Sequence, residues 1–140
     1  MIIHFVCTGN AYRSRLAEAY VNSKNLEEIS AISSGIAPDT YMSWLAGRII
    51  QKKNLAKPAS AFCQHTTDEL LKKGDFTVFM EDHHYDYAKN LGFNSDKYEI
   101  WDIPDLPPGI DDNERIKITE ETFEKIKTKT DDLLKRLPTD

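Results

Sequence analysis

Cysteine is scarce in this chain, which has only Cys7 and Cys63 among 140 residues. Two cysteines cannot form the disulfide network that stabilises small secreted domains. No apolar run approaches the roughly 20 residues needed to span a bilayer. The first run, at 1–6, is short, contains His4 and lacks a basic leader, so no signal peptide is expected. We therefore expect a cytoplasmic protein with reduced thiols and no membrane association.

Basic residues are also few relative to acidic ones. The chain has 18 Lys and Arg against 23 Asp and Glu, for a formal charge of −5. This balance argues against a nucleic-acid-binding protein, which would present a basic face. A small local anion site remains compatible with it, because backbone amides and one arginine can form such a site. A length of 140 residues suits one domain over 1–140.

Short apolar runs alternate with segments of helical periodicity along the whole chain. Strands are predicted at 2–6, 29–34, 75–80 and 97–101. Helices are predicted at 13–24, 40–53, 66–73, 83–90 and 118–136. This alternation predicts an α/β fold of three layers, with helices on both faces of a parallel sheet. Trp44 falls at helical spacing and is expected in the core, and the acidic residues 111–114 are expected in a solvated loop.

The opening segment places a thiol between a strand and a helix. Cys7 ends the first strand, and the next helix begins near Arg13. In such a sheet, ligands bind beyond the carboxyl ends of the strands. A helix N-terminus offers free N–H groups and a positive dipole, so the loop 8–13 can wrap an anion. Gly9 permits close approach and a positive φ, and Asn10 tolerates left-handed geometry.

The same groups suit Cys7 to nucleophilic chemistry. A helix N-terminus and a nearby arginine favour the thiolate form of a cysteine. The planar guanidinium of Arg13 matches two oxygens of a phosphate. A nucleophile that faces a cradle for phosphoryl oxygens is the geometry of phosphoryl transfer to sulfur.

The residues VCTGNAYRS at 6–14 resemble the signature Cys-x-Gly-Asn-x-Cys-Arg-Ser of the low-molecular-weight protein tyrosine phosphatases. The resemblance extends along the chain. SSG at 33–35 resembles the end of the family's second strand, and PD at 38–39 the start of its second helix. FTVFMED at 76–82 resembles its third strand, and WDIPDLPPG at 101–109 its acid-bearing loop.

This resemblance implies a flavodoxin-like sheet of four parallel strands in the order 2-1-3-4. It implies hydrolysis of phosphate monoesters, protein phosphotyrosine above all, through a phosphocysteine on Cys7, without metal or cofactor. The Arg13 fork and the backbone amides of the loop would hold the phosphoryl group, Ser14 would hydrogen-bond the thiolate, and Asn10 and Ser34 would brace the loop. The substrate-binding residues would be Thr8, Gly9, Asn10, Ala11, Tyr12 and Ser14. We expect a monomer or weak dimer that acts on a phosphorylated protein or small ester and takes phosphate, sulfate or vanadate in its site.

Two carboxylates are candidates for the acid that protonates the leaving group. Asp102 and Asp105 both follow the fourth strand and so reach the same sheet edge as Cys7. The family's acid usually precedes a proline, and Asp105 aligns with it although Leu106 has replaced the proline. Asp102 lies closer to the strand and suits a turn that stabilises the loop. We favour Asp105 as the acid and keep Asp102 as the alternative.

The chain departs from the family pattern at several positions. Tyr12 stands at the second cysteine of the signature, Arg15 at the usual proline, and Ala61 at a histidine that often braces the loop. The aromatic flanks of a phosphotyrosine cleft are reduced. Aromatic residues that could replace them are Tyr12, Tyr41, Trp44 and Tyr85.

Three other functions remain open. An arsenate reductase on this scaffold needs additional cysteines after the third strand, and 81–92 contains none. A phosphocysteine carrier shares the layout but needs neither Arg13 nor a general acid. A phosphate-binding module without turnover is the third alternative. It is compatible with Leu106 and Ala61, which replace the usual proline and histidine of the family pattern. The adjacent His83 and His84 lack partners at ligand spacing and are expected as a surface pair or rim contact.

Overall fold

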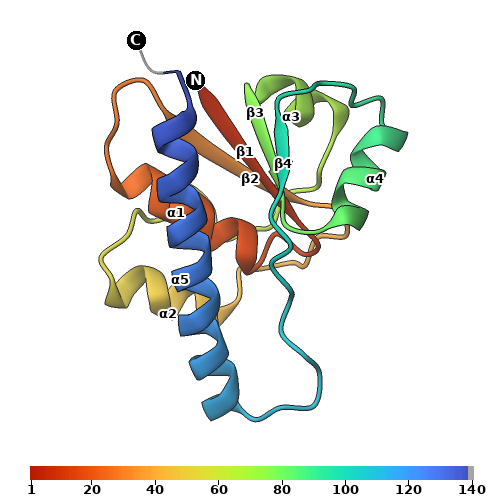
Figure 1. The fold of residues 1–140 in the computed structure, drawn as a ribbon. Helices are drawn as coiled ribbons and strands as arrows, with labels where there is room; N and C mark the ends of the chain where they lie inside the picture. The colour runs from red at the N-terminus through yellow and green to blue at the C-terminus, as the bar shows by residue number, and fades with distance from the viewer. Residues whose placement is uncertain (139–140) are drawn as a thin grey trace.

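The structure, a computed structural model, describes residues 1–138 of the chain. Within these residues four strands are each followed by one or two helices, five helices in all (Figure 1). They are β1 (Ile2–Cys7), α1 (Arg13–Ser23), β2 (Ser30–Gly35), α2 (Trp44–Lys52), α3 (Asp68–Lys73), β3 (Phe76–Phe79), α4 (Asp82–Asn90), β4 (Tyr98–Ile100) and α5 (Asp112–Arg136). No helix within residues 1–138 is long and apolar enough to cross a bilayer.

The strands form one parallel sheet in the order β2-β1-β3-β4, as predicted. Cys7 pairs with Gly35, and Val6 pairs with Phe79. The carboxyl ends of the three longest strands therefore meet at one edge. Because parallel strands need crossover connections, the loops after β1, β2 and β3 all leave the sheet at this edge.

Helices cover both faces of the sheet (Figure 1). On one face, α1, α2 and α5 pack on one another and enclose the larger apolar core, which takes alternate side chains of β1. Ile3 and Phe5 belong to this core, whereas Val6 and Phe79 pack in a smaller cluster on the other face, towards α3 and α4. The three layers agree with the predicted fold class.

Two helix starts differ from the prediction. The final helix begins at Asp112 rather than near 118, because the Asp111 carboxylate caps it by accepting from the Glu114 N–H at 2.9 Å. The residues expected in an acidic loop thus form its first turn. The second helix begins at Trp44 with Ser43 as its cap, and Trp44 is 53% exposed rather than in the core. Trp44 opens the helix on the side opposite the buried stripe of Leu45 and Ile49.

A histidine is buried in the central strand. His4 is fully buried and its Nε2 lies 2.7 Å from Ser34 Oγ, which in turn contacts Thr66 Oγ1 at 2.6 Å. Its Nδ1 has no hydrogen-bond partner among the described residues. Burial lowers the pKa of His4 to about 4, so the ring is neutral at physiological pH.

We expect this histidine to make the fold acid-sensitive. Between pH 6.5 and about 4 the unfolded chain binds a proton at His4 that the folded chain does not, so stability falls as the pH falls through this window. The loss amounts to about 3 kcal/mol at its lower end. Urea titrations at several pH values should show this slope, and His4→Phe, which keeps a buried ring, should reduce it. An unchanged slope in His4→Phe would contradict the assignment.

Candidate active site

The loop between β1 and α1 turns its carbonyl oxygens outward. Each carbonyl from residue 7 to residue 11 accepts a hydrogen bond from outside the loop, four from the backbone that follows β2 and one from the Arg15 side chain. The backbone donors are Ile36 N–H to Cys7 O, Ala37 N–H to Thr8 O, Asp39 N–H to Gly9 O and Ser43 N–H to Ala11 O. Within the described residues, no acceptor takes a hydrogen bond from the N–H groups of 8–12. A peptide's N–H points away from its carbonyl, so these donors are free to bind an anion.

Two features of the sequence make this loop shape possible. Asn10 has a φ of 54°, in the left-handed region, whereas Gly9 does not need a positive φ. Gly35 lies directly behind the loop, where a Cβ would stand 2.5 Å from Thr8 O and 2.6 Å from Asn10 N. Only glycine at this position lets the loop backbone lie against the end of β2.

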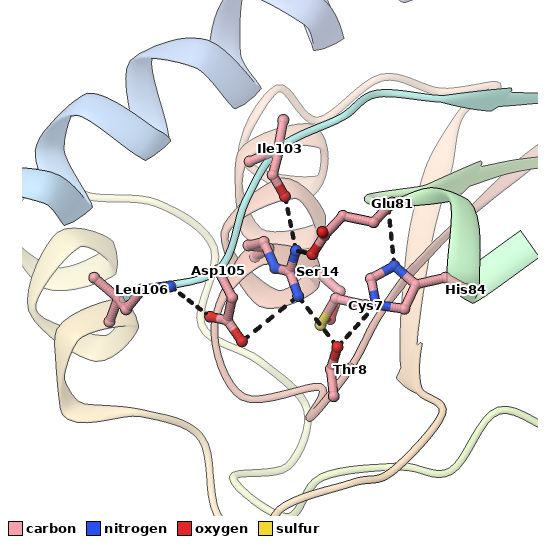
Figure 2. Close-up of polar contacts among 9 residues, drawn as sticks. Cys7, Thr8, Ser14, Glu81, His84, Ile103, Asp105 and Leu106 are labelled. Carbon is pink, nitrogen blue, oxygen red and sulfur yellow. Dashed lines mark hydrogen bonds and ion pairs between the residues drawn. The ribbon is translucent and has the colours of Figure 1, made fainter. Parts of the chain in front are cut away.

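Cys7 lies at the base of the loop, buried to 2% exposure. Its Sγ is 3.0 Å from Ser14 Oγ, as the resemblance implied (Figure 2). Ser14 Oγ also accepts a hydrogen bond from Asn10 Nδ2 at 3.0 Å. The Asn10 bond uses one of the two lone pairs of the Ser14 oxygen and leaves its hydroxyl proton available to donate to the sulfur once the sulfur is ionised.

Arg13 opens α1 and is 1% exposed. Its NH1 donates to the Glu81 carboxylate and to Ile103 O, the latter at 2.7 Å, and its NH2 lies 3.3 Å from Thr8 Oγ1 (Figure 2). Among residues 1–138, none accepts from its Nε–H. One edge of the guanidinium is thus held by the protein, and the Nε and NH2 edge remains for two oxygens of a ligand.

The first turn of α4 braces the other side of the loop. The Glu81 N–H donates to Nδ1 of His84 at 3.0 Å, which leaves the second ring nitrogen to donate to Thr8 Oγ1 at 2.8 Å (Figure 2). Burial, reinforced by the charges of Arg13 and His83, lowers the pKa of His84 to about 3. A neutral ring is what this donor and acceptor pattern requires.

An open pocket of about 190 Å³ lies above the loop. Its lining residues are Cys7, Gly9, Ala11, Tyr12, Arg13, Asp39, Ser43, Asp105 and Leu106. Asp105 Oδ2 lies 3.6 Å from Arg13 NH2, and Oδ1 accepts from the Leu106 N–H at 2.9 Å (Figure 2). The Asp39 carboxylate lies over Gly9, where its Oδ2 is 2.3 Å from the place a Cβ would take. The pocket is therefore lined by the Cys7 thiol and by two carboxylates, one near Gly9 and one near Arg13.

The structure brings together most of the residues proposed from the sequence. Asp105 lines the pocket, whereas Asp102 does not; Asp102 has a φ of 53° and turns the chain so that the neighbouring Ile103 carbonyl meets Arg13. The proposed brace at Ser34 is wrong. Ser34 contacts His4 on the other face of the strand, and Ser33 is the residue that accepts from Asn10 Nδ2, at 2.9 Å.

The expectation of a surface pair is wrong for His84, which is fully buried and contacts the loop at Thr8, whereas His83 is exposed. Sequence reasoning also missed Glu81 and Asp39 as neighbours of the loop. The position of Glu81, directly after the third strand, was a usable signal, because that strand ends at the same edge as Cys7. The second helix does not start at 38–39, where the resemblance puts it, because Ser43 is its cap, and this leaves Asp39 beside the loop.

Three potential metal ligands lie near this network. The donor atoms of Glu81, His83 and His84 are within 4.8 Å of one another. Both nitrogens of His84 are already hydrogen-bonded, and the Glu81 carboxylate holds Arg13. A metal bound here would break the contacts that position Thr8 and Arg13, so this donor set does not fit a resident metal.

Comparison with known proteins places this geometry in a family. The chain matches the family model of the low molecular weight phosphotyrosine protein phosphatases over residues 2–140. The comparison with curated proteins gave no significant match.

Several solved structures share the fold. A low molecular weight protein tyrosine phosphatase from T. tengcongensis is 24% identical, with a TM-score of 0.82 over 98% of this chain and 99% of that one. The YwlE arginine phosphatase from Geobacillus stearothermophilus is 22% identical, with a TM-score of 0.74 over 99% of each chain. A thioredoxin-dependent arsenate reductase from Corynebacterium glutamicum is 20% identical, with a TM-score of 0.70 over 96% of this chain and 60% of that one. The family match spans nearly the whole sequence, so the chain belongs to the low molecular weight phosphotyrosine protein phosphatase family.

Proposed function

We propose that this protein hydrolyses phosphate monoesters, protein phosphotyrosine in the first place, through a phosphocysteine on Cys7. The observation that carries the proposal is the position of the Cys7 thiol at the base of a ring of free amide N–H groups closed by Arg13. The test is turnover of 4-nitrophenyl phosphate and of phosphotyrosine peptides by the purified chain. Tight binding of vanadate without turnover would instead favour the phosphate-binding module.

In the first step the Cys7 sulfur attacks phosphorus from below while the ester oxygen leaves on the opposite side. The S–P bond forms as the P–O bond breaks. The amide N–H groups and the free edge of Arg13 hold the equatorial oxygens, where the negative charge of the transition state is spread. Asp105 at the rim gives its proton to the departing oxygen.

In the second step water attacks the phosphocysteine. The Asp105 carboxylate takes a proton from the water, the S–P bond breaks, and the sulfur regains its electron pair as a thiolate. Ser14 donates to that thiolate and makes it a better leaving group. The products are the alcohol or phenol and inorganic phosphate, and the enzyme returns to its starting state.

The assignment of the acid predicts a leaving-group effect. Asp105→Asn should lower kcat/KM, which reports formation of the phosphocysteine, by about 10²–10³-fold for phenyl phosphate, whose leaving group needs a proton, and much less for 4-nitrophenyl phosphate. Asp102→Asn is the matched control and should leave both rates near the wild-type value. The assignment would be wrong if Asp102→Asn produced the larger, leaving-group-dependent loss.

A second substrate class is favoured by the charge around the pocket. Asp39 and Asp105 both bring a carboxylate to the lining of the pocket, and the side chain of Asp105 is 55% exposed. A phosphorylated guanidinium, which carries positive charge beside its phosphoryl group, complements two carboxylates better than a neutral phenyl ring does. The G. stearothermophilus neighbour is described as an arginine phosphatase.

Phosphotyrosine and phosphoarginine peptides of the same sequence should separate these two classes. If phosphoarginine is the substrate, Asp39→Asn should lower kcat/KM for it by about tenfold and leave phosphotyrosine hydrolysis nearly unchanged. If phosphotyrosine is the substrate, the variant should raise its kcat/KM, because a negative charge is removed from the path of a dianion. Equal effects on both peptides would exclude Asp39 as a selectivity residue.

A further inference from the structure

Arg15 is a second arginine close to the anion loop, and it lies outside the pocket. It is 5% exposed and stands where the family signature usually has proline, a residue without side-chain donors. The charge of Arg15 acts on Glu18, which accepts from Ser33 Oγ at 3.1 Å. Burial raises the pKa of Glu18, and the charge of Arg15 opposes that rise. A buried guanidinium is costly unless its donors are satisfied.

Three backbone carbonyls accept hydrogen bonds from this guanidinium, one at each nitrogen. Arg15 Nε donates to Asn10 O at 2.8 Å, NH1 to Ser60 O at 2.8 Å and NH2 to Phe62 O at 2.5 Å. The same segment returns to the loop at Gln64, whose N–H donates to Asn10 Oδ1 at 2.8 Å. Residue 10 is thus held by its carbonyl and by its side chain.

Of the five loop carbonyls that are held from outside, only Asn10 O depends on a side chain. The other four accept from the backbone after β2, which no side-chain substitution removes. The peptide between Asn10 and Ala11 is planar, so the bond to its carbonyl also fixes the direction of the Ala11 N–H. Residue 10 is in the left-handed region, where a non-glycine residue needs support from its surroundings.

We propose that Arg15 is a positioning residue of the anion cradle: through Asn10 O it holds the Ala11 N–H towards the phosphoryl group, and through Ser60 O and Phe62 O it ties that loop to the segment behind it. The proposal rests on the proposed function, since it takes phosphate as the ligand. It adds that this chain orients one cradle amide with a side-chain guanidinium that the usual proline of the signature could not supply.

The test measures binding of inorganic phosphate to Arg15→Lys and Arg15→Met by titration of the ¹⁵N-labelled protein, with the Ala11 amide as the probe. Arg48→Lys and Arg48→Met are the matched controls, because Arg48 pairs with Glu120 on the helix surface. We expect Arg15→Met to raise the Kd of phosphate by about tenfold or more and to reduce the shift of the Ala11 amide. Arg15→Lys should raise the Kd by about threefold or more, because an ammonium cannot reach three carbonyls as a planar fork does.

If Arg15 had only a structural role, its substitution would lower Tm but leave the Kd of phosphate unchanged at temperatures well below Tm. The proposal is therefore overturned if Arg15→Lys binds phosphate with the wild-type Kd and the wild-type Ala11 shift, whether or not Arg15→Met folds. It is also overturned if the Arg48 variants weaken phosphate binding as much. If the wild-type protein does not bind phosphate, the proposed function fails and this proposal fails with it. If the wild type binds phosphate and turns over substrate, and the Arg15 variants bind phosphate as the wild type does, the proposed function stands and this proposal alone fails.

Discussion

Cys7→Ser is expected to lower kcat for aryl phosphates by about 10⁵-fold or more, the scale seen when a nucleophile is removed from a hydrolase. An alcohol keeps its proton at neutral pH and is a far weaker nucleophile than a thiolate. Within residues 1–138, Ser14 is the hydrogen-bond partner of the sulfur, and no imidazole or carboxylate is hydrogen-bonded to it to act as a base. The measurement is kcat under saturating 4-nitrophenyl phosphate.

The fold should survive this change, because serine is close to cysteine in size and can keep the contact with Ser14 Oγ. Phosphate and vanadate should therefore still bind. Cys63→Ser is the matched control, and it should retain wild-type turnover because Cys63 does not line the pocket. Substantial turnover in Cys7→Ser, or its loss in Cys63→Ser, would move the chemistry away from Cys7.

Arg13→Lys is the second change with a large expected effect, a loss of about 10²–10³-fold in kcat/KM. Lysine keeps the charge but has no planar fork. It cannot hold Glu81 and Ile103 O on one edge and two phosphoryl oxygens on the other. Because these contacts strengthen as charge develops, kcat should fall more than KM rises.

Inhibition by vanadate independently measures how well Arg13→Lys binds the transition-state geometry. Vanadate adopts the geometry of the transition state, so its affinity should fall with kcat/KM in Arg13→Lys. Arg48→Lys, at a residue that does not line the pocket, should change neither. Near-native kcat/KM in Arg13→Lys would show that the guanidinium does not clamp the phosphoryl group.

Most of the fold could be predicted because its signals are local. Strand–helix alternation predicts a parallel sheet, and the segment from Cys7 to Arg13 carries a thiol, a left-handed Asn10 and a helix start in an order that few other sites use. The sheet edge then brings residues after each strand together. This is why Asp105 could be placed over the loop before its distance to Arg13 was known.

The parts that could not be predicted depend on contacts between distant segments. His84 reads as one of two polar neighbours on a short helix, and only the packing of α4 shows that its ring meets Thr8. Ser33 and Ser34 are adjacent residues of the same type, and their side chains point to opposite faces of the strand. A one-residue difference in register therefore decides which of them faces Asn10. The role of Arg15 cannot be predicted from its neighbours in the sequence. Two of its acceptors are backbone carbonyls of the distant segment 60–62, which no residue type announces.

The most direct test of the central claim is a rapid acid quench of the wild-type protein during turnover of 4-nitrophenyl phosphate, followed by mass analysis of the peptide that contains Cys7. The leaving group of 4-nitrophenyl phosphate needs no proton, so the phosphocysteine should form faster than it is hydrolysed. The account predicts that this peptide gains the mass of one phosphoryl group and loses it as substrate is exhausted. Continued release of phosphate with the Cys7 peptide unmodified at every quench time would contradict it.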